Sequence, residues 1–215
     1  MDAVDDERVR IIESKSIYEK IGEKLFDSLE EDNIIDKTSI TTDHRRTDIK
    51  KIDLLSLYPK IDKLGRDKAT NEFTHLDRTF LLLSFYLFLC ENIKNIFTHE
   101  TYEKIFDKLP EKPFDKKLIK RHVQLSLAIQ ILEKYIEYKS ISPTTVFDVI
   151  DVDLRNSIAH NTFEDGEDFL KYYTRDMKEK NICGEEMIHK ILYAAVIFSG
   201  IQDAKMNFYV RTHTN

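Results

Sequence analysis

The sequence predicts an all-α protein built as an up-and-down bundle of amphipathic helices. Five glycines and four prolines among 215 residues are too few for the many tight turns of a sheet protein. Apolar residues recur every three or four positions along most of the chain, which is the period of a helix with one buried face. Apolar residues make up 41% of the chain and charged residues 33%, a balance typical of a globular protein.

The first half of the chain contains two long predicted helices. Apolar residues at helical spacing predict a helix over 5–31, with an acidic start that suits the helix dipole. Residues 32–48 lose this periodicity and are expected to form a loop, and a short helix follows from about 49 until Pro59 interrupts it. The pattern Thr74-x-x-Asp77 resembles a capping box and predicts that a strongly apolar helix covers 76–95.

The second half contains several further predicted helices. A short helix near 99–108 is expected to end before the next proline, and a longer one is expected over 116–139. Ser142-Pro143 has the form of a helix start, so 143–151 is predicted as a short helix. Another short helix is expected to begin at Asp153, and the last long helix is expected over 186–207.

Residues 168–183 fit two different structures. As a helix, Phe169, Tyr172 and Tyr173 would form one apolar edge. As a β-hairpin, 168–174 and 178–183 would pair around the turn sequence RDMK. Periodicity alone does not separate these alternatives.

Charge and cysteine content exclude several protein classes. A net charge of −6 argues against a general nucleic-acid coat protein, although it leaves room for a local basic groove. Cys90 and Cys183 have no metal-like spacing, so we expect no disulfide framework and no zinc site. The sequence also has no glycine-rich phosphate loop and no His-x-x-x-His pair, so no metal site and no cofactor are expected. The longest apolar runs, 79–90 and 191–201, are shorter than the roughly 20 residues of a bilayer span, so buried core helices are expected there. The lack of a disulfide framework fits a reducing cytoplasm, which is the expected location.

The window DLRNSIAHNTF, which starts at Asp153, contains the strongest candidates for catalytic or binding residues. If Asp153 is the helix N-cap, Arg155 and Asn156 fall in the first turn, where free backbone N–H groups favour anions. Arg155 supplies a fixed positive charge and His160 supplies an imidazole, the side-chain type that can gain or lose a proton near neutral pH, and the two together suit a phosphodiester. The alternative is a capped structural helix with a surface arginine and histidine. Because residues five apart on a helix point about 140° apart, a second subunit is one way to complete the site.

The stretch LRNSIAHN resembles the signature motif of the HEPN superfamily of helical-bundle proteins. Arg155, Asn156 and His160 match its arginine, polar residue and histidine, and Ile158-Ala159 matches the small apolar pair before the histidine. The resemblance is strong over about 153–161, and helix order extends it to roughly 74–208. It implies one HEPN-type domain over 1–215, with 1–70 as a family-specific helical extension. A small hairpin after the histidine is common in that family.

The resemblance also implies an activity. HEPN ribonucleases are metal-independent endoribonucleases that act as dimers, leave 2′,3′-cyclic phosphate ends and include toxins and antiviral factors. By this likeness His160 is expected as general acid–base, Arg155 as the group that stabilises phosphoryl charge and Asn156 as the residue that orients both. RNA, a second copy of the chain and an antitoxin or regulatory protein are the expected partners. Other members of the superfamily are catalytically silent dimerisation or nucleotide- and RNA-binding modules.

Surface charge near the motif separates these two functions. An RNA backbone requires cations close to Arg155, and the candidates are Lys117, Lys120, Arg121, Lys171 and Arg175. Lys116, adjacent to Lys117 in the sequence, is a further candidate cation. A cleft surrounded only by carboxylates would favour the binding module, and the carboxylates concerned are Asp148, Asp151, Glu164 and Asp165.

Overall fold

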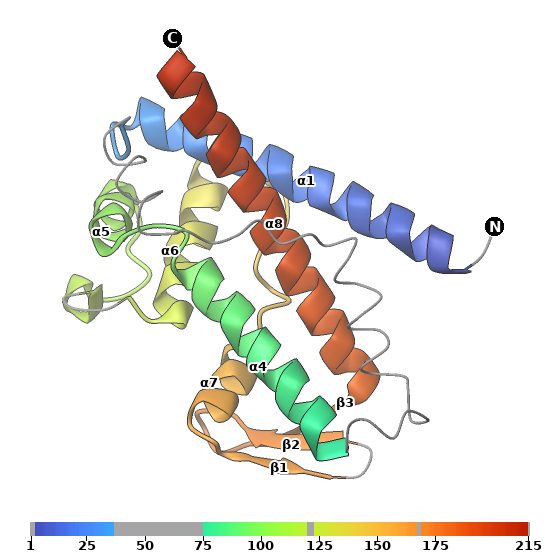
Figure 1. The fold of residues 1–215 in the computed structure, drawn as a ribbon. Coiled ribbons are helices and arrows are strands. Elements are labelled where there is room, and N and C mark those ends of the chain that lie inside the picture. The colour runs from blue at the N-terminus through green and yellow to red at the C-terminus, as the bar shows by residue number, and fades with distance from the viewer. Residues whose placement is uncertain (1–2, 37–74, 120–122, 167–168, 215) are drawn as a thin grey trace. The chain divides into compact units, whose positions relative to one another are not determined.

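The computed structural model describes residues 3–36, 75–119, 123–166 and 169–214, which are mostly helical (Figure 1). The prediction of a mainly helical protein is confirmed. A small antiparallel sheet of three strands follows the motif, so the hairpin alternative for 168–183 is also confirmed. The chain divides into two compact units. The first unit consists of Met1–Lys51, Ile93–Phe147 and Val196–Asn215, and the second of Ile52–Asn92 and Asp148–Ala195.

The first unit is a helical core. Its elements are α1 (Ala3–Glu31), α5 (His99–Lys108), the short 3-10 helix η1 (Lys116–Ile119), α6 (Leu125–Tyr138) and the later part of α8 (Gly184–Thr214). Phe26 of α1 is fully buried between aromatic rings, with centroids 5.5 Å from Phe97 and 5.8 Å from Phe208. Leu25 and Leu29 of the same helix are also fully buried, so the C-terminal part of α1 supplies side chains to this core.

Two glycines allow α1 and α8 to cross at close range. A Cβ atom at Gly22 would lie 2.6 Å from the Ala204 Cβ, and one at Gly200 would lie 2.7 Å from the Tyr18 Cβ. Real Cβ atoms do not approach so closely, so neither position accepts a larger residue without moving a helix.

One polar cluster fixes the end of α1 against α6. The Tyr135 hydroxyl donates to Asp32 Oδ2 (2.8 Å), and Lys139 Nζ lies 2.7 Å from Asp32 Oδ1. Burial by itself would raise the pKa of Asp32, but the hydrogen bonds from Lys139 and Tyr135 outweigh it, so the pKa lies below its usual value. The cluster therefore stabilises the ionised carboxylate.

The second unit combines one long helix, the motif helix and the sheet. It contains most of α4 (His75–Lys94), then α7 (Val152–Ala159), β1 (Phe163–Asp165), β2 (Phe169–Tyr173), β3 (Glu179–Cys183) and the start of α8. The strand order is β1-β2-β3, and Leu170 pairs with Ile182 across the two longer strands. Figure 1 shows α7 beside this sheet, where the Ser157 hydroxyl donates to the Tyr173 carbonyl (3.3 Å).

The structure corrects the predicted helix over 116–139. Helix η1 ends at Ile119, and α6 begins at Leu125 after Gln124, whose backbone is extended (φ −70°, ψ 153°). Leu118, which lies within the predicted helix, is 57% exposed. The side chains that α6 buries are Leu125, Ala128, Ile131, Leu132, Tyr135 and Ile136.

The predicted short helix over 143–151 is wrong. This segment consists of bends and turns, because side chains satisfy its backbone donors in place of helical carbonyls. Glu133 Oε1 accepts the backbone N–H groups of Val146 (2.7 Å) and Phe147 (2.6 Å). Ser142 Oγ accepts the N–H of Thr144 in a local turn.

The other predicted helices agree with the structure to within a few residues, except that α8 runs on to Thr214. The predicted loop beyond residue 36, the helix from about 49 and the cap residue Thr74 lie outside the described residues. No single helix in the described ranges is long and apolar enough to cross a bilayer, although α4 and α5 taken as a bent pair meet that test of length and composition.

Replacing Asp32 by Asn is expected to lower the free energy of unfolding by about 1–2 kcal/mol at pH 7, since a charge-assisted pair becomes a neutral contact. A lowered folded-state pKa contributes stability above the unfolded pKa and loses it as pH falls through the folded value. The difference between variant and wild type should therefore shrink below about pH 4. Urea unfolding at pH 7 and at pH 3 measures this difference in stability.

The matched control is Asp27→Asn, because Asp27 pairs with Arg211 on the surface of the same unit and both side chains are about half exposed. Its effect should stay below about 0.5 kcal/mol. Equal effects of the two substitutions would contradict the assigned role of Asp32.

Candidate functional site

Helix α7, which carries the motif, begins at Asp151 and not at the predicted cap Asp153. Asp151 Oδ1 accepts the backbone N–H of Leu154 (2.9 Å), which is the geometry of an N-cap. The backbone N–H of Asp151 donates to the buried Tyr86 hydroxyl on α4 (2.8 Å). Asp151 Oδ2 accepts from the Tyr172 hydroxyl on β2 (2.7 Å). One residue therefore joins the start of α7 to both α4 and β2.

The two tyrosine hydroxyls that contact Asp151 stay protonated. Burial is the largest cause that raises the pKa of Tyr86, and the same holds for Tyr172, where the hydrogen bond to Asp151 adds to it. Burial also raises the pKa of the Cys90 thiol, to about 12. These groups act as neutral structural donors and not as acids or nucleophiles.

Helix α7 ends immediately after the motif. His160 is its C-cap, and Asn161 takes a left-handed backbone (φ 53°) that stops the helix. The N–H of Asn161 donates to the Ile158 carbonyl (3.2 Å), and that of Thr162 donates to the Ser157 carbonyl (2.9 Å). This pair of bonds is a Schellman motif. The exposed His160 side chain thus projects from the end of a well-defined helix.

Arg155 is held in place by two side chains. Its Nη2 group forms a close ion pair with Glu91 of α4, and Nη1 donates to Asn156 Oδ1 (3.0 Å). The Arg155 side chain is 19% exposed and that of Glu91 is 31% exposed. Arg155 Nε is buried and makes no hydrogen bond with the described residues. The guanidinium is thus oriented but already partly neutralised.

The prediction of an anion site at the start of the motif helix is wrong. Asp151 occupies the cap position, so Arg155 lies two residues further into α7 than predicted. Its backbone N–H is not free but donates to the Asp151 carbonyl (3.0 Å). Two carboxylates, Asp151 and Asp153, also lie at this end of the helix and oppose an anion. Any phosphate chemistry must therefore use the Arg155 side chain.

The predicted RNA-binding cations divide among different parts of the chain. Lys120 and Arg121 lie outside the described residues, and Lys117 lies on η1 in the first unit. In the second unit, Lys171 on β2 has carboxylates of Glu164 (3.3 Å) and Glu179 (3.5 Å) close to its ammonium group.

Arg175 is an exposed cation in the turn between β2 and β3. Its backbone N–H donates to Asp153 Oδ1 (3.4 Å), and no ion pair of its side chain is found among the described residues. Nearby, Lys180 Nζ lies 3.8 Å from Asp153 Oδ2. Cations and carboxylates therefore alternate around α7, so neither a wholly basic nor a wholly acidic surface surrounds the motif.

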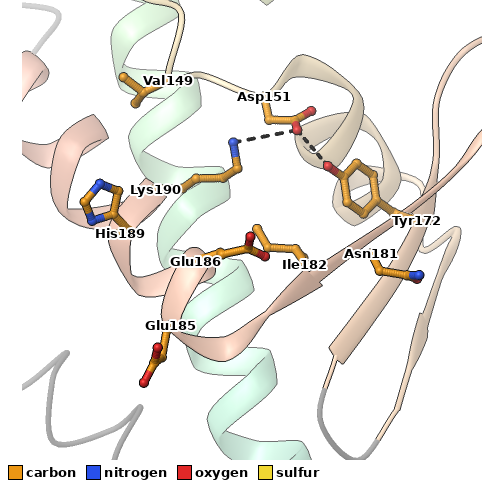
Figure 2. Close-up of a pocket in the computed structure, with 9 residues that line it drawn as sticks. All are labelled: Val149, Asp151, Tyr172, Asn181, Ile182, Glu185, Glu186, His189 and Lys190. Atoms are coloured by element: carbon orange, nitrogen blue, oxygen red, sulfur yellow. Dashed lines mark hydrogen bonds and ion pairs between the residues drawn. The ribbon is translucent and has the colours of Figure 1, made fainter.

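A cavity of about 590 Å³ lies in the second unit beside the cap of α7 (Figure 2). Asp151 and Tyr172 line one side, and Figure 2 shows Lys190 pointing toward Asp151, with Nζ 3.8 Å from Oδ2. Glu185, Glu186 and His189 of α8 line another part. None of the predicted site residues lines this cavity, so it is distinct from the Arg155 cluster.

Sequence reasoning missed the residues that complete the site. Glu91 lies 64 positions before Arg155, and only its polarity within the apolar run FYLFLCEN set it apart. Asp151 was overlooked because Asp153 is an equally good cap by residue type. Tyr172 gave no signal, since the helix or hairpin alternative left its direction open.

No family model, curated protein or solved structure matches this chain. Among the described residues, no group of three or more His, Cys, Asp and Glu side chains could hold a metal ion. What α7 does present is one oriented guanidinium, one amide that accepts from it and one exposed imidazole. That set can bind an anion and transfer a proton.

The cap assignment makes a direct prediction. Asp151→Ala should lower the free energy of unfolding by about 1–3 kcal/mol, because the helix loses its cap and the Tyr172 hydroxyl loses its acceptor. Asp153→Ala should cost much less, since its contacts are long (3.4 and 3.8 Å). Urea unfolding compares the two, and amide hydrogen exchange of 152–159 should accelerate in the first variant alone. The reverse ranking would restore Asp153 as the cap.

Proposed function

We propose that this protein is a metal-independent endoribonuclease of the HEPN type that acts as a homodimer. The observation that carries the proposal is the arrangement on α7. There, Arg155 is oriented by Glu91 and Asn156, and His160 is exposed at the C-cap five residues later. Long apolar helices before the motif, and a small sheet and a long helix after it, support the HEPN resemblance.

The proposed reaction needs no cofactor. The RNA 2′-hydroxyl attacks the adjacent phosphorus, and an imidazole takes its proton. The bond from phosphorus to the 5′-oxygen breaks, and that oxygen receives a proton from a second imidazole. Arg155 stabilises the charge on the phosphoryl oxygens, and Asn156 orients the guanidinium. The products carry a 2′,3′-cyclic phosphate and a 5′-hydroxyl.

A dimer supplies the second imidazole. On α4, Phe80 is 53% exposed and Phe88 is 46% exposed, and Leu81 is also exposed between them. Phe80 and Glu91 are eleven residues apart, which places them within about 20° on the helix circumference. The exposed apolar strip of α4 thus continues toward the residue that holds Arg155. Exposed apolar strips of this kind support an interface with a second copy.

Within this class, we propose a toxin or defence-type ribonuclease with an antitoxin or regulatory protein as partner. The pairing of cations with carboxylates favours a second candidate function. Arg155 with Glu91, Lys171 with Glu164 and Lys180 with Asp153 leave little net positive charge around α7. A catalytically silent HEPN dimerisation or nucleotide- and RNA-binding module would have such a balanced surface.

Cleavage of mixed RNA in EDTA tests the proposal. His160→Ala and Arg155→Ala should each lower the rate about 10²–10⁴-fold, because each removes a group that acts on the reacting phosphate. The double variant should lose less than the product of the two single losses, since both residues act on one step. Activity should fall as salt screens the RNA backbone.

Circular dichroism and thermal unfolding of each variant serve as controls for folding. Glu185→Ala, which alters an exposed residue at the start of α8 outside the Arg155 cluster, should retain full activity. Cleavage that requires added magnesium, or a double variant as active as wild type, would refute the ribonuclease. Absence of cleavage together with RNA binding would select the silent module.

The dimer has its own test. Phe80→Asp/Phe88→Asp should shift the protein from dimer to monomer in sedimentation at micromolar concentration, because two charges would be buried in the apolar interface. The helical spectrum should persist, since both side chains are exposed in the single chain. Val210→Asp, at an equally exposed apolar position of the first unit, should leave the dimer intact. If the wild-type protein is a monomer, the proposed interface on α4 is wrong.

A further inference from the structure

Arg155 does not present a free guanidinium to a ligand. A guanidinium has five N–H groups, and it binds a phosphate or carboxylate most strongly through two of them on one edge. The edge that includes Nε is closed, because Nε is buried. The edge formed by Nη1 and Nη2 remains, and in this structure it is engaged by Asn156 and Glu91.

Of these two partners, only Glu91 carries charge. A carboxylate and a phosphodiester both offer a pair of oxygens to a guanidinium, and Glu91 Oε1 already contacts Nη2, a nitrogen that an RNA phosphate would use. It also cancels the charge of Arg155, which weakens the attraction of the motif for a polyanion. The Glu91 side chain is 31% exposed, so it can leave the guanidinium without opening the core.

We propose that Glu91 is a built-in competitor for the phosphodiester site at Arg155, which holds the enzyme in a resting state. RNA binds only when its phosphate displaces the Glu91 carboxylate from the guanidinium. The protein then exchanges one counter-charge for another, so that Arg155 is never buried without a partner. This inference rests on the proposed function for the identity of the ligand, but the contact itself is independent of any cleavage.

The two possible roles of Glu91, competitor or positioning residue, predict opposite changes in RNA affinity when its charge is removed. If Glu91 only oriented Arg155, removal of its charge would weaken RNA binding and slow cleavage. If Glu91 competes with phosphate, removal of its charge strengthens binding. Glu91→Gln is the informative change, because the amide keeps the size and one acceptor oxygen while the charge is lost.

The experiment measures binding of a fluorescent 2′-O-methyl RNA oligonucleotide, which cannot react, by anisotropy at low salt. Glu91→Gln should bind this RNA about three- to tenfold more tightly than wild type, in line with a partly exposed charged pair. Glu185→Gln makes the same change in net charge at an exposed position of the same unit and should bind like wild type. Adding Arg155→Ala to Glu91→Gln should abolish the gain, since the effect passes through Arg155.

The outcomes separate this inference from the ribonuclease proposal. Tighter binding by Glu91→Gln through Arg155, without RNA cleavage by wild type, supports the competitor and refutes the ribonuclease. Cleavage by wild type, with equal or weaker binding by Glu91→Gln, supports the ribonuclease and overturns the competitor. If thermal unfolding shows that Glu91→Gln does not fold, Glu91→Asp replaces it. That variant keeps the charge but shortens the reach, and it should bind RNA more tightly than wild type; binding no tighter than wild type overturns the proposal.

Discussion

The position of the motif helix depends on Asp151. Its carboxylate caps α7 and accepts from Tyr172 of β2, while its backbone N–H donates to Tyr86 of α4. The 2.7–2.9 Å lengths of these bonds and the burial of both tyrosines make the junction a fixed point of the second unit. From that point α7 runs for two turns and stops where Asn161 adopts its left-handed backbone. The direction of Arg155 and the exposure of His160 both follow from these two ends.

The same geometry explains why the arginine and the histidine of the motif have different surroundings. Arg155 is engaged by neighbouring side chains, whereas His160 is exposed. Arg155 lies on the side of α7 that contacts α4, where Glu91 and Asn156 engage its terminal nitrogens. His160 lies at the other end of the helix, with a backbone that is no longer helical. Their separation around α7 suits a site shared between two copies, in which each copy supplies an imidazole to a phosphate bound near a guanidinium.

The helical elements were predictable because their signal is local. Apolar spacing marked α1 and α8, a capping box before an apolar run marked α4, and a following proline marked the end of α5. Scarce glycine and proline marked the helical class. Three features escaped because they depend on side chains distant in sequence. Glu133 satisfies the backbone of Val146 and Phe147, so no helix forms there. Asp151 caps α7, and its contacts with Tyr86 and Tyr172 come from elements distant in sequence. Glu91 reaches Arg155 from another helix, and no spacing rule within a single segment could find that pair.

The proposed ribonuclease reaction is tested most directly by the chemical groups at the ends of the RNA products. A synthetic RNA incubated with the protein in EDTA should yield fragments whose 5′ ends are phosphorylated by polynucleotide kinase without prior phosphatase treatment. Their 3′ ends should carry a cyclic phosphate, and a single 2′-deoxy nucleotide at the cleavage position should block the reaction there. Fragments with 5′-phosphates, or cleavage that tolerates the 2′-deoxy nucleotide, would show that the 2′-hydroxyl is not the nucleophile and would contradict the account.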